Sequence, residues 1–240
     1  KYLEKMKWAL VSFLILYTFL AGQSQNTSLI NQLEEELKNT TAPDQQVRLH
    51  SQLLDLYEVY NANKALEHAH SAWEVASHAS LKPQMAYLAH RLGQIYQKYI
   101  VDVNMAVTWQ LDGLRTAEDI RDSALIAEYS YDLAYSIAEQ GDKTRANQHL
   151  DRAIKIAAKT GDYQMLIRAN TMAGDLAFSS KEKYSFYRRG LIIAEQHPSD
   201  TLSMVYAWSK MGDHCFSSKQ KEQATYWYGK VFDLLDPSFQ

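Results

Sequence analysis

The sequence predicts an all-α protein built from repeated helix pairs. Glycine and proline, the residues that most often interrupt helices, are scarce at 9 and 4 of 240 residues. Short sequence patterns recur with a period of about 40 residues, a length typical of helical repeats. No stretch alternates apolar and polar residues as a β-strand would, and apolar residues instead follow helical spacing, as in Ala146, Leu150, Ala153 and Ala157.

The clearest repeat lies near the C-terminus. Residues 173–181 and 211–219 share the pattern Gly-Asp-x2-Phe-Ser-Ser-Lys and are 38 residues apart. Upstream, Leu92–Tyr96 and Leu133–Ile137 occupy the equivalent place in their own units. This frame divides the chain into about five units. An alanine near the start of the second helix marks most of them: Ala65, Ala106, Ala146 and Ala224.

Each unit is expected to form two helices, because turn-forming residues punctuate it at regular points. Gly141-Asp142 and Gly161-Asp162 each combine a glycine that ends one helix with an aspartate that caps the next. All four prolines lie at inferred helix ends. The predicted helices span 27–39, 44–60, 63–78, 82–98, 103–119, 122–139, 143–159, 162–178, 181–196, 200–217 and 219–235.

The last unit resembles the tetratricopeptide repeat. Its residues Trp208-x2-Met-Gly-x2-Cys-x8-Ala-x3-Tyr-x2-Val231 follow the pattern W-x2-L-G-x2-Y…A-x3-F in almost every position. Other units match less closely, and the resemblance covers about residues 44–237. It implies a right-handed α-α superhelix, a TPR-like solenoid of about five helix pairs plus an N-terminal helix. Small residues would let the paired helices approach at Gly93, Ala134, Gly174 and Gly212.

The N-terminal residues have the layout of a secretory signal peptide. Lysines precede an uncharged run from Trp8 to Ala21, and small or polar residues follow. We therefore predict a signal peptide over 1–24, a helix and linker over 25–43, and the repeat domain over 44–240. An exported, periplasmic protein is expected. The alternative is an uncleaved inner-membrane anchor, although a spanning helix needs roughly 20 apolar residues.

Composition and motifs argue against several classes of function. A net charge of −3 and a pI of about 6.3 are unlike the basic character of nucleic-acid-binding proteins. The sequence contains none of the phosphate-loop, dinucleotide, serine-hydrolase or HExxH motifs. His68 and His70 would point to different sides of a helix, and the single Cys215 occupies a packing position. We predict no enzymatic activity, no cofactor and no metal site.

The resemblance also implies which residues line the concave groove. In tetratricopeptide repeats the first helix of each unit contributes its second, fifth, ninth and twelfth positions. Here these positions hold five carboxylates, two arginines and six aromatic rings, which suit a protein or peptide partner with basic and apolar residues. The Lys and Asn residues with which chaperone-binding members hold a C-terminal carboxylate are missing. The predicted partner-binding residues are Tyr87, His90, Gln94, Glu128, Tyr131, Tyr135, Arg168, Asp175, Tyr206 and Asp213; the other groove positions are Arg48, Ser51, Asp55, Glu58, Gln97, Ala138, Thr171, Phe178, Ser209 and Phe216.

Two functional hypotheses follow from this interpretation. The first is an exported, non-enzymatic scaffold that holds a partner along its concave groove. The second is the periplasmic sensor region of a membrane histidine kinase or helix-turn-helix regulator, with the chain cut short at Gln240. An apolar run of roughly 20 residues encoded soon after Gln240 would favour the receptor. The aromatic rings of the groove could instead seal neighbouring helices against each other.

Overall fold

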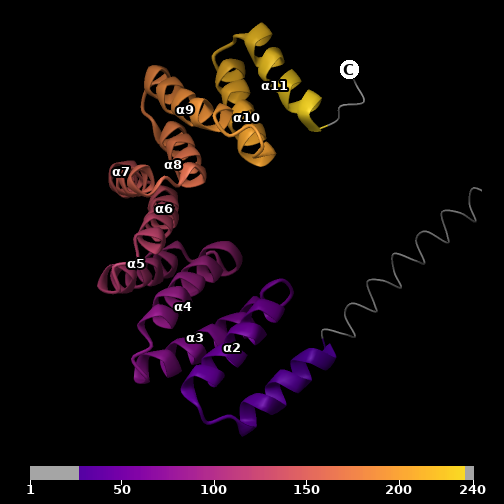
Figure 1. The fold of residues 1–240 in the computed structure, drawn as a ribbon, viewed down its shortest axis with the longest axis vertical. Coiled ribbons are helices and arrows are strands. Elements are labelled where there is room, and N and C mark those ends of the chain that lie inside the picture. Colours follow the sequence, from indigo (N-terminus) through magenta and orange to yellow (C-terminus); the bar gives the residue numbers. More distant parts are fainter. Residues whose placement is uncertain (1–26, 236–240) are drawn as a thin grey trace, which may run out of the picture. The chain divides into compact units, whose positions relative to one another are not determined.

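The computed structural model describes residues 27–235, and this part of the chain is helical with no β-strand. Residues 27–39 form the first described helix. Ten further α-helices and one π-helical segment follow it within the described range (Figure 1). Their bounds are α2 Pro43–Glu58, α3 Ala62–His78, α4 Lys82–Ile95, η1 Tyr96–Ile100, α5 Val103–Asp119, α6 Ser123–Glu139, α7 Lys143–Thr160, α8 Tyr163–Leu176, α9 Ser180–Glu195, α10 Thr201–Ser217 and α11 Lys221–Leu235.

The helix pattern predicted from the sequence is confirmed, and the differences lie at helix ends. The helix predicted to run to residue 98 changes at Tyr96 into the π-helical segment η1, a feature with no sequence signal here. Helix α8 stops before residue 178 because Ala177 adopts an extended backbone. Directly after it, Ser179 caps α9 in a reciprocal capping box with Glu182.

A left-handed residue precedes the helix cap at most turns. Gly141 and Gly161 have φ angles of 89° and 78°, as expected of glycines that end helices. The carboxylate of Asp142 then accepts a hydrogen bond from a backbone N–H in the first turn of α7. Side chains that rarely adopt this conformation take it at four further turns, with φ between 56° and 62°: Ser80, Val101, Arg121 and Lys219.

The helices fall into two compact units divided between Ile100 and Val101. The first unit contains the helix at 27–39, α2, α3, α4 and η1, and the second contains α5 to α11. Within each unit, consecutive helices pack against each other through apolar faces. The core of the first unit includes Val47, Ala72, Ala76 and Leu88; a core of the second includes Ile167, Tyr187, Leu191, Ala207, Trp208 and Met211.

Two glycines allow close approach of paired helices in the second unit. The ring of Tyr187 on α9 lies against Gly174 on α8, in the space that a Cβ atom would fill. The ring of Tyr228 on α11 lies in the same way against Gly212 on α10. The predicted role of small residues is therefore confirmed at both of these positions.

The predicted signal peptide over residues 1–24 lies outside the described residues. Among the helices within 27–235, none combines the length and the apolar character that crossing a bilayer requires.

Candidate functional site

In the second unit, the first helices of three successive pairs share a face of charged and aromatic side chains. Helix α8 packs against both α6 and α10. Side chains of α8 can therefore contact side chains of both helices. We call this surface the A-helix face, and we include in it the polar and aromatic residues that interact there. They are Tyr131, Asp132 and Tyr135 of α6, Arg168 and Asp175 of α8, and Tyr206 and Lys210 of α10.

Arg168 links α8 to α6. Its guanidinium carbon lies 4.4 Å from the centroid of the Tyr131 ring, within the range of a cation–π contact. A guanidinium nitrogen also lies 4.0 Å from the carboxylate of Asp132. Tyr135 follows one turn after Tyr131 on the same side of α6, and 48% of it is exposed. The A-helix face therefore presents an accessible ring beside an arginine that is already oriented.

Asp175 links α8 to both helices that follow it. Lys210 Nζ on α10 lies 2.7 Å from one carboxylate oxygen, and the hydroxyl of Tyr187 on α9 donates to the other. Lys210 Nζ also lies 5.9 Å from the centroid of the Tyr206 ring. Burial, with the nearby Tyr131 and Asp175, raises the pKa of Tyr206 to about 12. Its hydroxyl is therefore protonated at neutral pH and can donate a hydrogen bond.

The Asp213 carboxylate lies on α10, about one turn after Lys210. It accepts a hydrogen bond of 2.6 Å from the hydroxyl of Tyr228 on α11. This bond is the main reason that the pKa of Tyr228 is raised to about 12. Near the ends of α8 and α10, Phe178 and Phe216 are 75% and 66% exposed. These two rings add accessible apolar surface beyond the ion pairs.

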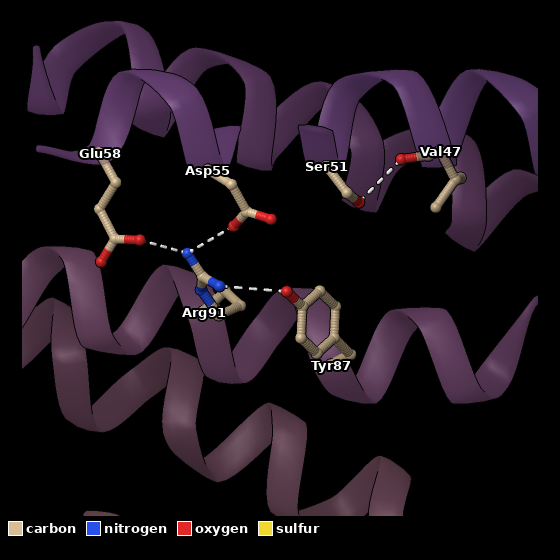
Figure 2. Close-up of polar contacts among 6 residues, drawn as sticks. All are labelled: Val47, Ser51, Asp55, Glu58, Tyr87 and Arg91. Atoms are coloured by element: carbon tan, nitrogen blue, oxygen red, sulfur yellow. Dashed lines mark hydrogen bonds and ion pairs between the residues drawn. The ribbon is translucent and has the colours of Figure 1, made fainter. Parts of the chain in front are cut away.

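The first unit carries a separate polar cluster centred on Arg91 of α4. Figure 2 shows the guanidinium group directed at Asp55 and Glu58, which both project from α2. Arg91 Nη2 lies 3.0 Å from the Asp55 carboxylate and also pairs with Glu58. Its other terminal nitrogen donates a hydrogen bond of 3.1 Å to the hydroxyl of Tyr87. Only 16% of the arginine side chain is exposed, so these partners hold it in one position.

Most of the predicted partner-binding residues are accessible, but His90 is not. Tyr87 and Glu128 are exposed and Gln94 is half-buried, as a contact role requires. His90 is only 4% exposed because its side chain lies within the helix packing of the first unit, so it offers little surface to a partner. Its partner contact stays a prediction. Thr171, a further groove position, is 1% exposed and donates its hydroxyl hydrogen to the Ile167 carbonyl.

Three charged residues of these surfaces were not predicted: Arg91, Asp132 and Lys210. Each follows directly after a position that the repeat pattern assigned to the groove. Because one residue rotates a helix by roughly 100°, an error of a single position separates a buried side chain from an exposed one. All three lie at the sixth position of the first helix of their unit, and this recurring charge was a usable signal in the sequence.

The histidines of α2 and α3 have separate neighbours. His68 Nδ1 lies 3.0 Å from His50 Nδ1, and its ring stacks on Tyr57 at 5.5 Å. His70 instead lies 3.2 Å from the hydroxyl of Tyr96. Within residues 27–235, no three His, Cys, Asp or Glu side chains gather closely enough to hold a metal ion.

No protein-family model and no curated protein sequence matches the chain. Solved structures do match. The first is BtubC from P. vanneervenii, with a TM-score of 0.71 at 13% identity over 88% of each chain. The TPR-like repeats of a kinesin light chain from Podosopora anserina give 0.67 at 14% identity, over 83% of this chain and 99% of that one. NprR in complex with its cognate peptide gives 0.58 at 17% identity, over 85% of this chain and 62% of that one. The protein has the TPR-like helical repeat fold.

Proposed function

We propose that this protein is a non-enzymatic scaffold that binds a peptide segment of a partner along the A-helix face. The observation that carries this proposal is the cluster around Arg168, where a cation–π contact and an ion pair lie one helical turn from the exposed ring of Tyr135. Tyr131, which Arg168 holds in place, loses little side-chain freedom on binding, and aromatic rings supply much of the affinity in known interfaces. A preformed surface of this kind suits recognition of an extended chain.

A structural neighbour supports a peptide as the partner. NprR, which shares this fold, was solved with its cognate peptide bound. The helices of the A-helix face favour a basic peptide here. Together α6, α8 and α10 carry five carboxylates and two cationic side chains, so their net charge is 2 − 5 = −3. Apolar side chains of the same peptide would pack on Tyr135, Phe178 and Phe216.

Selection of peptides on the full chain tests this proposal. A displayed library of random 12-residue peptides would be selected against the protein, and the recovered sequences measured by calorimetry. We expect peptides enriched in basic and apolar residues. Replacing both Tyr131 and Tyr135 by alanine should weaken their binding at least tenfold, since aromatic anchors contribute roughly 2 kcal/mol or more.

A matched control separates binding from folding. Phe232 on α11 is 70% exposed and lies outside the A-helix face, so Phe232→Ala should leave both affinity and melting temperature unchanged. Unchanged affinity in a folded Tyr131→Ala/Tyr135→Ala variant would refute the proposed binding surface. Loss of folding in that variant would assign both rings to the core.

We further propose that the chain is exported and that residues 1–24 are removed. The support is the order of lysines, apolar run and small residues at the N-terminus. Expression from Met6 in a bacterium should give a periplasmic protein that begins between Gln23 and Gln25. Recovery of intact Met6 in the membrane fraction would instead support an anchor, and with it the sensor hypothesis.

A further inference from the structure

A pocket in the second unit opens on the opposite side of α10 from the A-helix face. It has a volume of about 440 Å³, in the range of pockets that accept ligands or side chains. Tyr184 of α9 borders it on one side, and Tyr226 and Trp227 of α11 border it on the other. Buried Met211 and Cys215 of α10 lie at its base. Tyr184 and Tyr226 are 43% and 56% exposed, so the apolar lining is open to a partner.

Three lysines lie beside this aromatic pocket. Lys230 Nζ lies 5.2 Å from the Tyr226 ring centroid and 5.5 Å from that of Trp227. Lys219 and Lys221 line an adjoining hollow that shares Glu222 and Gln223 with the pocket. The pocket and this hollow together form a groove with an apolar centre and a positive rim. Glu222 is the carboxylate that lines the pocket.

On its α9 side, the pocket is bordered by a ring that lies near a buried histidine. The ring centroid of Tyr184 lies 5.7 Å from that of His214. His214 is 7% exposed, and its pKa is lowered by burial and, to a lesser extent, by the charge of Lys183. The lysines near the pocket therefore come from α11 and from the turn before it.

We propose that this groove binds an acidic peptide segment that carries one large apolar side chain. The apolar side chain would fill the pocket between Tyr184 and Tyr226, and flanking carboxylates would pair with Lys219, Lys221 and Lys230. Lys219, Lys221 and Lys230 outnumber Glu222 around the pocket and disfavour a basic ligand, because like charges repel across a surface of this size. Helices α6, α8 and α10, which carry the A-helix face, have a net charge of −3, so the two surfaces select different partners.

A labelled peptide of this chemistry tests the inference on the full chain. The probe is a fluorescein-labelled pentapeptide with a central phenylalanine flanked by two aspartates on each side. We expect its anisotropy to rise on titration with the protein and the affinity to fall with added salt. Peptides with a central serine, or with lysines in place of the aspartates, should bind at least tenfold more weakly.

Two variants locate the binding in the groove. Tyr184→Ala/Tyr226→Ala removes two partly exposed rings, and Lys219→Glu/Lys221→Glu reverses two exposed charges. Each should weaken binding of the acidic peptide at least tenfold, while the melting curve measured by circular dichroism shows that the variant is folded. Tyr135→Ala on the A-helix face should leave this peptide's affinity unchanged, so failure here is distinguishable from failure of the proposed scaffold function. Equal binding of the lysine peptide, or no effect of either groove variant, would overturn the proposal. A dimer in sedimentation that Tyr184→Ala/Tyr226→Ala dissolves would assign the groove to a second copy instead.

Discussion

The ring of Tyr187 fills the space that Gly174 leaves empty, and its hydroxyl donates a hydrogen bond to Asp175, the next residue along α8. Tyr228 repeats this relationship on Gly212 and the aspartate that follows it. In both pairs one tyrosine fixes the distance between two helices and also orients a carboxylate on the first helix. The Gly-Asp sequences at 174–175 and 212–213 therefore couple the packing of each helix pair to a carboxylate on its first helix.

Gly212→Leu should destabilise the last helix pair. A Cβ atom at this position would lie 2.6 Å from a ring carbon of Tyr228, so the helices must separate to admit it. Overpacking of this kind costs about 1–3 kcal/mol. Limited proteolysis should cut residues 201–235 faster in the variant than in the wild type, and the melting temperature should fall.

Gly229 on α11 provides the matched control. A Cβ atom there would meet nothing within 4 Å, so Gly229→Ala should raise stability by about 0.5–1 kcal/mol through helix propensity. Equal proteolysis of the two variants would contradict the role of Gly212 in helix approach.

Arg121→Gly should stabilise the turn between α5 and α6. Arg121 has a φ of 59°, a conformation that costs an L-residue about 1 kcal/mol and costs glycine nothing. Gly141 occupies the equivalent position before α7, so Gly141→Ala should destabilise the protein by a similar amount. Urea unfolding measures the stability of both variants. A change of the same sign in both would contradict the shared backbone geometry at the two positions.

Arg91→Met should lower the free energy of unfolding of the first unit. The substitution leaves Glu58, whose side chain is 21% exposed, without its cationic partner and also removes the contacts to Asp55 and Tyr87 (Figure 2). Loss of one member of a largely buried pair should cost about 1–3 kcal/mol, measured by chemical unfolding. Arg48→Met is the control. The Arg48 side chain is 62% exposed and lies 3.9 Å from Glu36, so its loss should cost less than about 0.5 kcal/mol.

Acidification should destabilise the contact between α2 and α3. Burial and, to a lesser extent, His68 lower the pKa of His50 from 6.5 to about 4. As pH falls from 6.5 to 4, the unfolded chain gains a proton at His50 that the folded chain does not, so stability decreases over this window and the loss is complete below it. Because the ring is half-exposed, solvent screens part of this shift, and we expect a loss of about 1–2 kcal/mol.

The variant His50→Gln tests this contribution. Its stability should vary less between pH 6.5 and pH 4 than that of the wild type, while other histidines keep part of the dependence. His78→Gln, at an exposed position at the end of α3, should reproduce the wild-type profile. Identical profiles for wild type and His50→Gln would show that His50 makes no such contribution.

Much of the fold could be predicted because its determinants are local in sequence. Aspartate caps, glycines after helices and alanines at close contacts recur with the period of the helix pairs. The π-helical segment at Tyr96–Ile100 and the left-handed Arg121 and Val101 leave no such mark, since the surrounding packing imposes them.

The candidate site could be predicted only to within one residue. The repeat pattern brought Tyr131, Arg168 and Asp175 to one face, but it chose buried His90 over its neighbour Arg91. A sequence pattern predicts which residues of a helix face a groove to within about one position. The rotation that decides between adjacent residues depends on how neighbouring helices pack, and this is a property of the folded structure.

Hydrogen exchange of the full chain, with and without a basic 12-residue peptide selected on it, tests the central claim most directly. The A-helix face predicts slower exchange in α6, α8 and α10 when the peptide is bound, and the same peptide should give no slowing in the Tyr131→Ala/Tyr135→Ala variant. Slower exchange confined to α7, α9 and α11 would contradict the claim and move peptide binding to the other side of the repeats.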